Sequence, residues 1–281
     1  MDPLAFGVVS HAVAASELPL LDEFLSAVST RLGAPVRPYF CSSYDDIAAR
    51  MMAGALDVAW LPPIVFLGLE LRGVAVPLVT NPRGGEARFV SVLMTSASSA
   101  VRIADEAIRT AASLPGARVA WVERWSASGY VIPRMGLWAE GIDVRMAFGG
   151  ERFFGSHEAV VRAVLGGKAD VGATYANTDA LGRIVRGAWS RLVGAEESIR
   201  IINTWNDIPS DVFAAHGNLS SRERITVCNA MLDAAASPRG RGLVRRIFGS
   251  DRLSPWSLET YEPLRARVME AAALGLLDAL K

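Results

Sequence analysis

Lysine is nearly absent from this sequence, and its scarcity argues against one class of enzyme. The chain has 281 residues and 29 basic side chains, of which only Lys168 and Lys281 are lysine. An enzyme that forms a Schiff base needs a lysine amine, so this chemistry has almost no place here. The 29 acidic residues balance the basic ones, and the formal net charge is zero. Without a net positive field, we expect no binding to a nucleic-acid backbone.

Cysteine and histidine are also scarce. The two cysteines, Cys41 and Cys228, lie far apart in the chain, and there are three histidines in all. No C-x-x-C pair occurs, so these residues do not form a recognisable set of metal ligands. We expect buried free thiols, with a single disulfide as the alternative, and we expect neither a metal nor a cofactor.

Long apolar runs and the common catalytic motifs are missing too. No segment approaches the ~20 apolar residues that a membrane span requires, so no span is expected. The G-x-S-x-G elbow, the nucleotide-binding loop G-x-x-x-x-G-K-[S/T], the H-E-x-x-H zinc motif and the dinucleotide glycine fingerprint do not occur. The sequence therefore predicts a protein that is not an enzyme. A hydrolase with Ser128 activated by His157 is the less favoured alternative, because no third orienting group is evident.

What the chain does contain is an alternation of strand and helix patterns, typical of an α/β fold. Half of its residues are hydrophobic, enough to fill the cores of two lobes. The predicted strands are Leu4–Val9, Val36–Phe40, Asp57–Leu61, Val74–Val79, Phe89–Met94, Arg118–Val122, Val144–Phe148, Asp170–Thr174, Ile199–Asn203 and Val212–Ala214.

Helical spacing of apolar residues fills the segments between these strands and nearly all of the last 60 or so residues. The predicted helices are Leu18–Leu32, Asp45–Ala53, Ile103–Ala112, Gly129–Ala139, Glu158–Leu165, Thr178–Arg186, Ser221–Ala235, Gly240–Phe248 and Leu258–Leu280.

Two turn-rich breaks divide this series. They lie near 81–88 and 205–212, and each contains proline beside glycine, serine or aspartate. If the chain leaves the first lobe at one break and returns at the other, lobe one contains 1–83 plus 211–281. Lobe two then contains 86–208.

One strand-to-helix junction stands out chemically. The sequence Ser126-Ala127-Ser128-Gly129-Tyr130 follows a predicted buried strand and opens a predicted helix. Free backbone N–H groups and the helix dipole favour an anion at such a point. The hydroxyls add donors, and glycine lets the backbone approach a ligand closely. An ordinary serine N-cap is the structural alternative.

Two further segments accompany this loop. Ser156-His157 opens the next helix, and the run Ala163-Val164-Leu165-Gly166-Gly167-Lys168-Ala169-Asp170-Val171-Gly172 leads into a strand. In the N-terminal half, Tyr44-Asp45-Asp46-Ile47 precedes Gly54-Ala55-Leu56-Asp57-Val58-Ala59-Trp60-Leu61-Pro62-Pro63. Together these motifs resemble the substrate-binding proteins of phosphonate and phosphate-type ABC importers, from Phe6 to about Leu219.

The resemblance implies a two-lobed, type II-like periplasmic-binding-protein fold with two hinge crossings and a ligand cleft between the lobes. It implies an anion loop made of Ser126, Ser128 and the N–H groups of Ala127, Gly129 and Tyr130. Ser156 and His157 would lie beside this loop, and Tyr44 would contribute a hydroxyl from the other lobe.

Relatives that take aminoalkylphosphonates hold the ligand's ammonium with acidic residues. Asp179 and Asp211 fall in the matching regions, and we predict that they have this role. The alternative places Asp179 in a first helical turn and Asp211 in a hinge turn. The implied partners are a small anionic or zwitterionic ligand and an ABC transporter permease.

The chain departs from the family at several points. Ala127 replaces a third hydroxyl of the loop, and Phe89 stands where a second binding tyrosine is expected. Trp60, Trp125 and Trp205 would make the site more apolar, so an aromatic or amino-acid-like carboxylate is the alternative ligand unless these rings belong to the core.

The compartment and the partner stay open at this stage. Asp2 and Pro3 lead straight into a strand without the features of a signal peptide. We therefore expect either a periplasmic protein whose leader has been removed or a cytoplasmic relative. A sensory module that signals to a partner protein is the corresponding alternative function.

Overall fold

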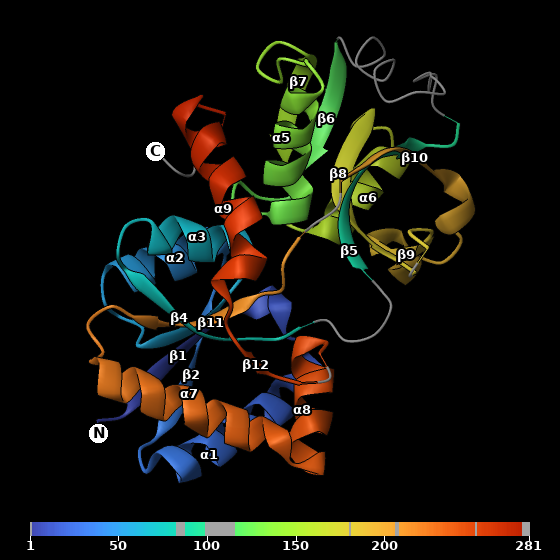
Figure 1. Cartoon of the computed structure of the whole chain (residues 1–281). Helices are drawn as coiled ribbons and strands as arrows, with labels where there is room; N and C mark the ends of the chain where they lie inside the picture. Colours follow the sequence, from blue (N-terminus) through green and yellow to red (C-terminus); the bar gives the residue numbers. More distant parts are fainter. Residues whose placement is uncertain are drawn as a thin grey trace. The chain divides into compact units, whose positions relative to one another are not determined.

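The computed structural model describes residues 2–82, 88–98, 116–179, 181–205, 208–250 and 252–276. The chain forms two compact units, each built on its own β-sheet (Figure 1). Unit 1 contains Met1–Gly85 and Pro209–Glu262, and unit 2 contains Glu86–Ile208 and Pro263–Lys281.

This division differs from the sequence prediction at the C-terminus, where 211–281 was assigned whole to the first lobe. The chain from Pro263 onward groups with unit 2, so the boundary falls inside helix α9 (Leu258–Ala273). In the predicted crossings, 83–87 and 206–207 lie outside the described residues.

The sheet of unit 1 has the strand order β12-β4-β11-β3-β1-β2. Strand β1, next to the edge strand β2, pairs in parallel with both β2 and β3. The strands are β1 (Leu4–Val9), β2 (Val36–Cys41), β3 (Val58–Leu61), β4 (Ala75–Thr80), β11 (Val212–His216) and β12 (Ser254–Pro255). The helices are α1 (Leu18–Leu32), α2 (Tyr44–Met52), α3 (Pro63–Glu70), α7 (Ser221–Ala236) and α8 (Pro238–Phe248), followed by α9.

The core of unit 1 lies between the sheet and helices α1, α7 and α8, and a group of aromatic rings packs within it. Trp60 stacks on Phe213 at 6.2 Å between ring centroids and meets Phe248 edge-on at 4.9 Å. Such pairs add to the burial of large apolar surface. Trp60 is therefore a core residue of unit 1, which was the alternative to a place in the ligand site.

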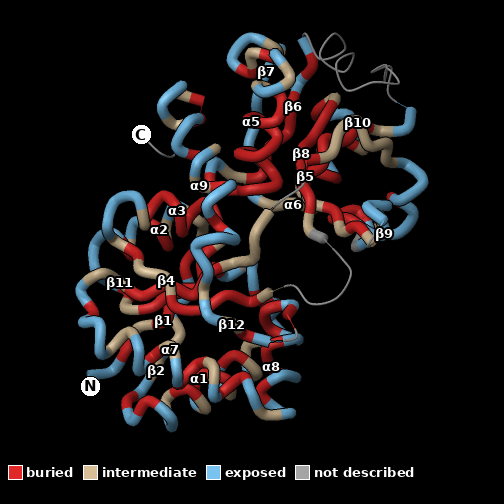
Figure 2. The backbone as a smooth tube through the Cα atoms, in the orientation of Figure 1, coloured by how far each residue is buried: buried red, intermediate tan, exposed pale blue. Residues whose placement is uncertain are grey.

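The sheet of unit 2 has the order β10-β5-β8-β6-β7, and β9 pairs with β8. The strands are β5 (Arg88–Ser96), β6 (Ala117–Trp121), β7 (Phe148–Phe153), β8 (Val171–Thr178), β9 (Ile184–Gly187) and β10 (Ile199–Trp205). Its helical elements include the π-helix η4 (Ala127–Val131), α5 (Ile132–Ala139), α6 (His157–Leu165) and the short 3-10 helices η5 (Ala188–Arg191) and η6 (Glu196–Ser198). In Figure 2, the central strands of both sheets are buried, which fits their nearly continuous apolar sequences.

Two predicted elements of unit 2 are wrong. The strand predicted at Val144–Phe148 begins at Phe148 instead, because a turn held by the carbonyl of Asp143 occupies the preceding residues. The helix predicted at Thr178–Arg186 is a tight hairpin, since β8 runs to Thr178 and pairs antiparallel with β9.

Smaller differences concern helix α3 and the two remaining helix predictions. α3 was not predicted, because it is buried all round and so lacks a polar face. Helix α9 ends at Ala273, two residues before Gly275, whose φ of 68° is left-handed. The helix predicted at Ile103–Ala112 lies outside the described residues.

Among the described helices, none combines the length and the apolar character needed to cross a bilayer.

Candidate ligand-binding site

The predicted anion loop lies at one edge of the unit 2 sheet. Strand β6 pairs in parallel with both β7 and β8, so the carboxyl ends of all three strands meet at this edge. Ligands of open α/β sheets bind outside such ends. Ser126 follows β6, and Ser156 follows β7. Two backbone hydrogen bonds of 2.9 Å, Phe154 N–H to Trp121 O and Gly155 N–H to Val122 O, keep the two exits side by side.

Ser126 begins the helical segment, as the sequence predicts. Its Oγ accepts a hydrogen bond of 3.0 Å from the Gly129 N–H, which makes it the N-cap of η4. The π-helix continues directly into α5. Ser126 and Ser128 are 3% and 2% exposed, and Ala127 is also buried. Ser126 thus has the geometry of an ordinary N-cap. Because its oxygen only accepts this hydrogen bond, its hydroxyl hydrogen is available for a bond to a ligand.

Gly129 is required sterically rather than conformationally. A Cβ atom at this position would lie 2.3 Å from Cγ2 of Val122 and 2.8 Å from Oγ of Ser126. The Gly129 carbonyl also accepts a 3.2 Å hydrogen bond from the Val122 N–H. The loop therefore packs directly on the end of β6, and only glycine fits there.

A serine that sequence reasoning missed holds the centre of the loop. Ser91 on β5 is fully buried, and its Oγ donates a 2.7 Å hydrogen bond to the carbonyl of Ser128. The one signal in the sequence is a polar residue inside the apolar run Val90–Met94. The bond leaves the Ser128 side chain unused, and none of the described residues hydrogen-bonds to its Oγ.

Tyr130 has its ring in the interior of unit 2. The ring meets Trp121 edge-on at 5.5 Å, and the guanidinium carbon of Arg134 lies 5.1 Å from its centroid. Arg134 pairs with Glu151 at 2.5 Å, and Glu151 also accepts a 2.7 Å bond from the Trp121 indole. Tyr130, Trp121 and Arg134 are buried, and their contacts support the start of α5.

His157 is the first residue of α6, and Ser156 caps that helix by accepting a 3.2 Å bond from the Ala159 N–H. The His157 ring is half-buried. Its Nδ1 lies 2.9 Å from Oγ1 of Thr174, and its ring meets Tyr175 edge-on at 4.9 Å. Both partners belong to β8, so the histidine is attached to the same strand edge as the loop.

Asp170, just before β8, and Gly172, its second residue, are structural. A Cβ at Gly172 would lie 2.8 Å from both Val160 and Val164, so glycine permits α6 to pack closely on the strand. The Asp170 carboxylate binds Arg118 through its side chain and backbone N–H at 2.7–3.0 Å. These hydrogen bonds from Arg118 lower the pKa of Asp170. The motif therefore fixes the β6–β8 pair that presents the site.

Asp179 lies in the β8–β9 turn, not in a helical turn. Its Oδ1 accepts hydrogen bonds from the N–H groups of Leu181 and Arg183 at 3.0 and 2.9 Å. Its Oδ2 accepts a 2.7 Å bond from the Arg183 guanidinium. The Arg183 side-chain hydrogen bond, ahead of the other contacts, lowers the pKa of Asp179. This carboxylate is already supplied with a cation and two N–H donors.

The two remaining predicted residues belong to unit 1. Tyr44 is the half-buried first residue of α2, behind the N-cap Ser43, whose Oγ accepts a 3.1 Å bond from the Asp46 N–H. Asp211 is half-buried and immediately precedes β11. The remaining members of the predicted set are in unit 2.

The aromatic residues that the sequence considered for the site divide into two groups. Trp205 packs on Gly136 of α5 and donates a 3.0 Å hydrogen bond to Glu140, so it is a buried structural residue. Phe89 is half-buried and stacks on Tyr175 with 5.1 Å between centroids. Trp125 is also buried, and Phe89 lies beside a contact of His157.

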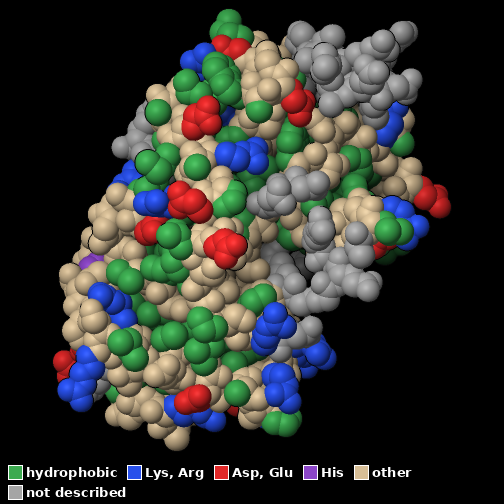
Figure 3. Space-filling model, in the orientation of Figure 1, with side chains coloured by type: hydrophobic (Ala, Val, Ile, Leu, Met, Phe, Trp, Pro, Cys, Tyr) green, Lys and Arg blue, Asp and Glu red, His purple; other side chains and the backbone are tan. Residues whose placement is uncertain are grey.

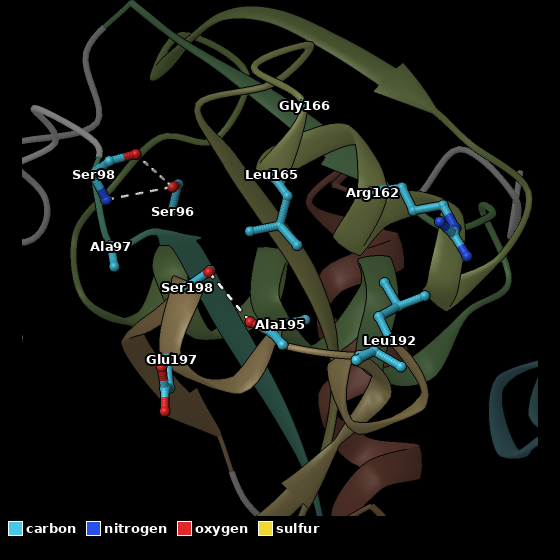
Figure 4. A pocket seen from close by; sticks show the side chains of 12 residues that line it. Ser96, Ala97, Ser98, Arg162, Leu165, Gly166, Leu192, Ala195, Glu197 and Ser198 are labelled. Atoms are coloured by element: carbon cyan, nitrogen blue, oxygen red, sulfur yellow. Dashed lines mark hydrogen bonds between the residues drawn. The ribbon is translucent and has the colours of Figure 1, made fainter.

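A cavity of about 690 Å³ elsewhere in unit 2 does not coincide with this site (Figure 4). Its walls come from Ser96–Ser98, the C-terminal end of α6 near Leu165, and the segment 192–198. Its described lining includes none of the predicted ligand residues, and the one basic residue in that lining, Arg162, pairs with Glu158.

In Figure 3, basic and acidic side chains are interspersed over the visible face. Across the described ranges, no group of three or more His, Cys, Asp and Glu residues could hold a metal ion.

Comparison with known proteins places this geometry in a family. Residues 6–261 match the family described as the periplasmic substrate-binding protein of phosphonate ABC transporters. Because the match covers most of the chain, the protein belongs to this family of substrate-binding proteins. The match extends well beyond Leu219, where the sequence resemblance was placed.

Individual relatives agree. The phosphate-import protein PhnD of Mycolicibacterium smegmatis is 24% identical over 164 residues, which cover 55% of this chain and 49% of the relative. The chain thus spans about half the length of that curated relative. XAC2383 from Xanthomonas citri, solved with chloride, has a TM-score of 0.76 at 20% identity over 96% of this chain and 99% of its own.

A third relative is PhnD1 from Prochlorococcus marinus, solved in complex with methylphosphonate. It has a TM-score of 0.73 at 16% identity, over 96% of this chain and 98% of its own. These solved structures confirm the predicted periplasmic-binding-protein fold.

Proposed function

We propose that this chain is a non-catalytic solute-binding protein that holds one small phosphonate-like or phosphate anion at the Ser126–Tyr130 loop. The observation that carries the proposal is the pair of buried serines where a helix opens at the carboxyl edge of parallel strands. Backbone N–H groups and the helix dipole favour an anion there. A serine hydroxyl facing an ionised oxygen makes a strong, charge-assisted hydrogen bond.

The histidine geometry favours binding over hydrolysis. In a serine hydrolase, a carboxylate holds the imidazole and stabilises its charged form. Here the partner of Nδ1 is the neutral hydroxyl of Thr174. Together with the substrate-binding character of the family, this supports a role without catalysis. By the same membership, the permease of an ABC importer is the proposed partner and the periplasm the proposed compartment.

The paired state of Asp179 argues against an ammonium-reading role for this residue. The proposed ligand is accordingly an anion that need not carry an amine. Tyr44 and Asp211 stay candidates for contacts from unit 1, and Tyr44→Phe and Asp211→Asn test them directly.

Ser128→Ala is the cleanest test of the loop, because the Ser128 side chain bonds no described residue and its carbonyl tether to Ser91 survives. A lost charge-assisted bond of about 1.5–3 kcal/mol corresponds to roughly ten- to hundredfold weaker binding. Calorimetric titration with inorganic phosphate and with methylphosphonate measures this change. Replacing Ser126 as well should bring the loss to at least about a hundredfold on the same arithmetic.

The matched control is Ser98→Ala, an exposed serine at the end of β5, which should leave both affinities unchanged. If the Ser128→Ala protein binds both anions as tightly as the parent, the loop is not the anion site. The melting temperature of the Ser126 variant should also be measured, because losing an N-cap destabilises a helix by about 1 kcal/mol.

A further inference from the structure

We infer that Thr174 is a positioning residue for His157. Its hydroxyl holds the neutral imidazole in the tautomer with hydrogen on Nε2, so that His157 offers an N–H donor and not a lone pair. The inference deepens the proposed function, since it assigns how the histidine of that site is prepared for an anion.

The hydroxyl of Thr174 is buried in the sheet of unit 2. This residue lies in the middle of β8, is 0% exposed, and is paired across the ladder with Val92. A buried hydroxyl in apolar surroundings needs an acceptor for its hydrogen. Among the described residues, the one side-chain partner within hydrogen-bond distance of Thr174 Oγ1 is Nδ1 of His157, at 2.9 Å.

The tautomer follows from this pairing. In a neutral imidazole, one ring nitrogen carries hydrogen and the other accepts. If Thr174 donates its only hydroxyl hydrogen to Nδ1, then Nδ1 must be the acceptor and Nε2 must carry the hydrogen. The opposite tautomer would leave the buried hydroxyl hydrogen without an acceptor.

The ring of Tyr175 also restricts the orientation of the His157 imidazole. Tyr175 follows Thr174 on the strand, and its ring meets the His157 ring at 83° with 4.9 Å between centroids. A rotation of the imidazole that exchanged its two edges would have to pass this ring. Thr174 therefore determines which ring nitrogen of His157 carries the hydrogen, and Tyr175 restricts rotation of the imidazole ring.

The consequence for an anion is specific. A neutral His157 with hydrogen on Nε2 donates to an oxygen anion, whereas a bare Nε2 lone pair would repel it. A protonated His157 would donate from both nitrogens, with Thr174 then accepting at Nδ1. Nε2 thus carries hydrogen in either protonation state.

Nitrogen NMR of the protein labelled with ¹⁵N-histidine tests the tautomer without any ligand. The chain has three histidines, and the His157 signals are those that disappear in His157→Gln. At pH 8.5, about two units above the ordinary histidine pKa of about 6.5, the parent should show Nε2 protonated and Nδ1 bare. Thr174→Ser should give the same pattern, whereas Thr174→Val should move the two nitrogen shifts toward each other.

Titration with inorganic phosphate measures the effect of the tautomer on binding. Thr174→Val should weaken binding about three- to tenfold, Thr174→Ser should restore it, and Thr174→Val should have no further effect in the His157→Gln background. Hydrogen on Nδ1 in the parent, or a Thr174→Val spectrum equal to the parent's, overturns the inference. If Thr174→Val does not fold, the parent spectrum and Thr174→Ser still decide. Failure of the parent to bind both phosphate and methylphosphonate refutes the proposed function, while the spectra judge the tautomer independently.

Discussion

At the scale of single residues, the structural role of Ser126 is compatible with the binding role proposed for the same side chain. Its oxygen accepts the Gly129 N–H and thereby caps the helix, while its hydrogen is left to donate. A serine can do both because a hydroxyl is one donor and two acceptors. The choice between N-cap and anion contact, which the sequence left open, is therefore not exclusive.

Gly129→Ala should damage both stability and binding. The added methyl would lie 2.3 Å from Val122, and overpacking of this kind destabilises a protein by about 1–3 kcal/mol. Urea unfolding should show a lower midpoint, and titration with phosphate should show weaker binding because the loop is displaced. Gly150→Ala is the matched control, since nothing lies within 4 Å of a Cβ there. An unchanged midpoint for Gly129→Ala would contradict the packing described for the loop.

The residues that the sequence could not assign are those whose partners are distant in the chain. Ser91 and Thr174 each appear in sequence as a polar residue inside an apolar strand. Their partners, the Ser128 carbonyl and the His157 imidazole, are 37 and 17 residues away. Strand pairing creates these contacts, and local patterns carry no information about them. Ser126 and Ser156 were predictable because a cap bonds to N–H groups three residues on.

At the scale of elements, the β8–β9 hairpin shows where periodicity misleads. Leu181, Ile184 and Val185 are spaced like one face of a helix, yet they belong to a turn and a short strand. Gly182 has a φ of 80°, a left-handed conformation that a helix does not allow. Asp179 then closes the turn through its own side chain. Short segments of mixed spacing are decided by such turn chemistry and by pairing with a neighbouring strand.

Asp179 should therefore matter more for this hairpin than for a ligand's ammonium. Asp179→Ala removes the acceptor for two N–H groups and the ion pair with Arg183, so it should lower the melting temperature. Asp179→Asn keeps an acceptor oxygen and should lower it less. Titrations with matched phosphonates, with and without an amine, should show no loss of preference in either variant. A selective loss of affinity for the aminated compound would return Asp179 to the binding site.

At the scale of the whole molecule, the order and spacing of several weak motifs identified the family, although each motif alone has a local structural explanation. Asp170 and Gly172 fix packing, Ser156 caps a helix, and Gly129 fits a tight space. The two-sheet α/β architecture followed from the alternation of strands and helices. The ligand's identity did not follow, because N–H and hydroxyl donors bind any small oxyanion. The C-terminal grouping with unit 2 also depends on tertiary contacts that the sequence pattern does not reveal.

The paired carboxylates predict how stability depends on pH. Arg145, through its side-chain hydrogen bond first, lowers the pKa of Asp143 to about 2. Partners also lower the pKa values of Glu23, Asp46, Asp170 and Asp179. A depressed carboxyl pKa contributes stability above the unfolded value, and this contribution is lost as the pH falls through the folded value. Urea midpoints should thus be steady from pH 7 to 5 and fall between about pH 4 and 2. A midpoint that stays constant down to pH 2.5 would contradict these pairings.

If the loop binds an anion as proposed, its tether to Ser91 has a consequence for the speed of ligand capture. Because a buried hydroxyl holds the loop's central carbonyl to β5, the N–H donors are arranged before a ligand arrives. A loop that needs no ordering loses little conformational entropy on binding. Association is then limited by diffusional encounter and not by a search among loop conformations. The serine on the strand would govern how fast an anion is captured, while the serines of the loop govern how long it is retained.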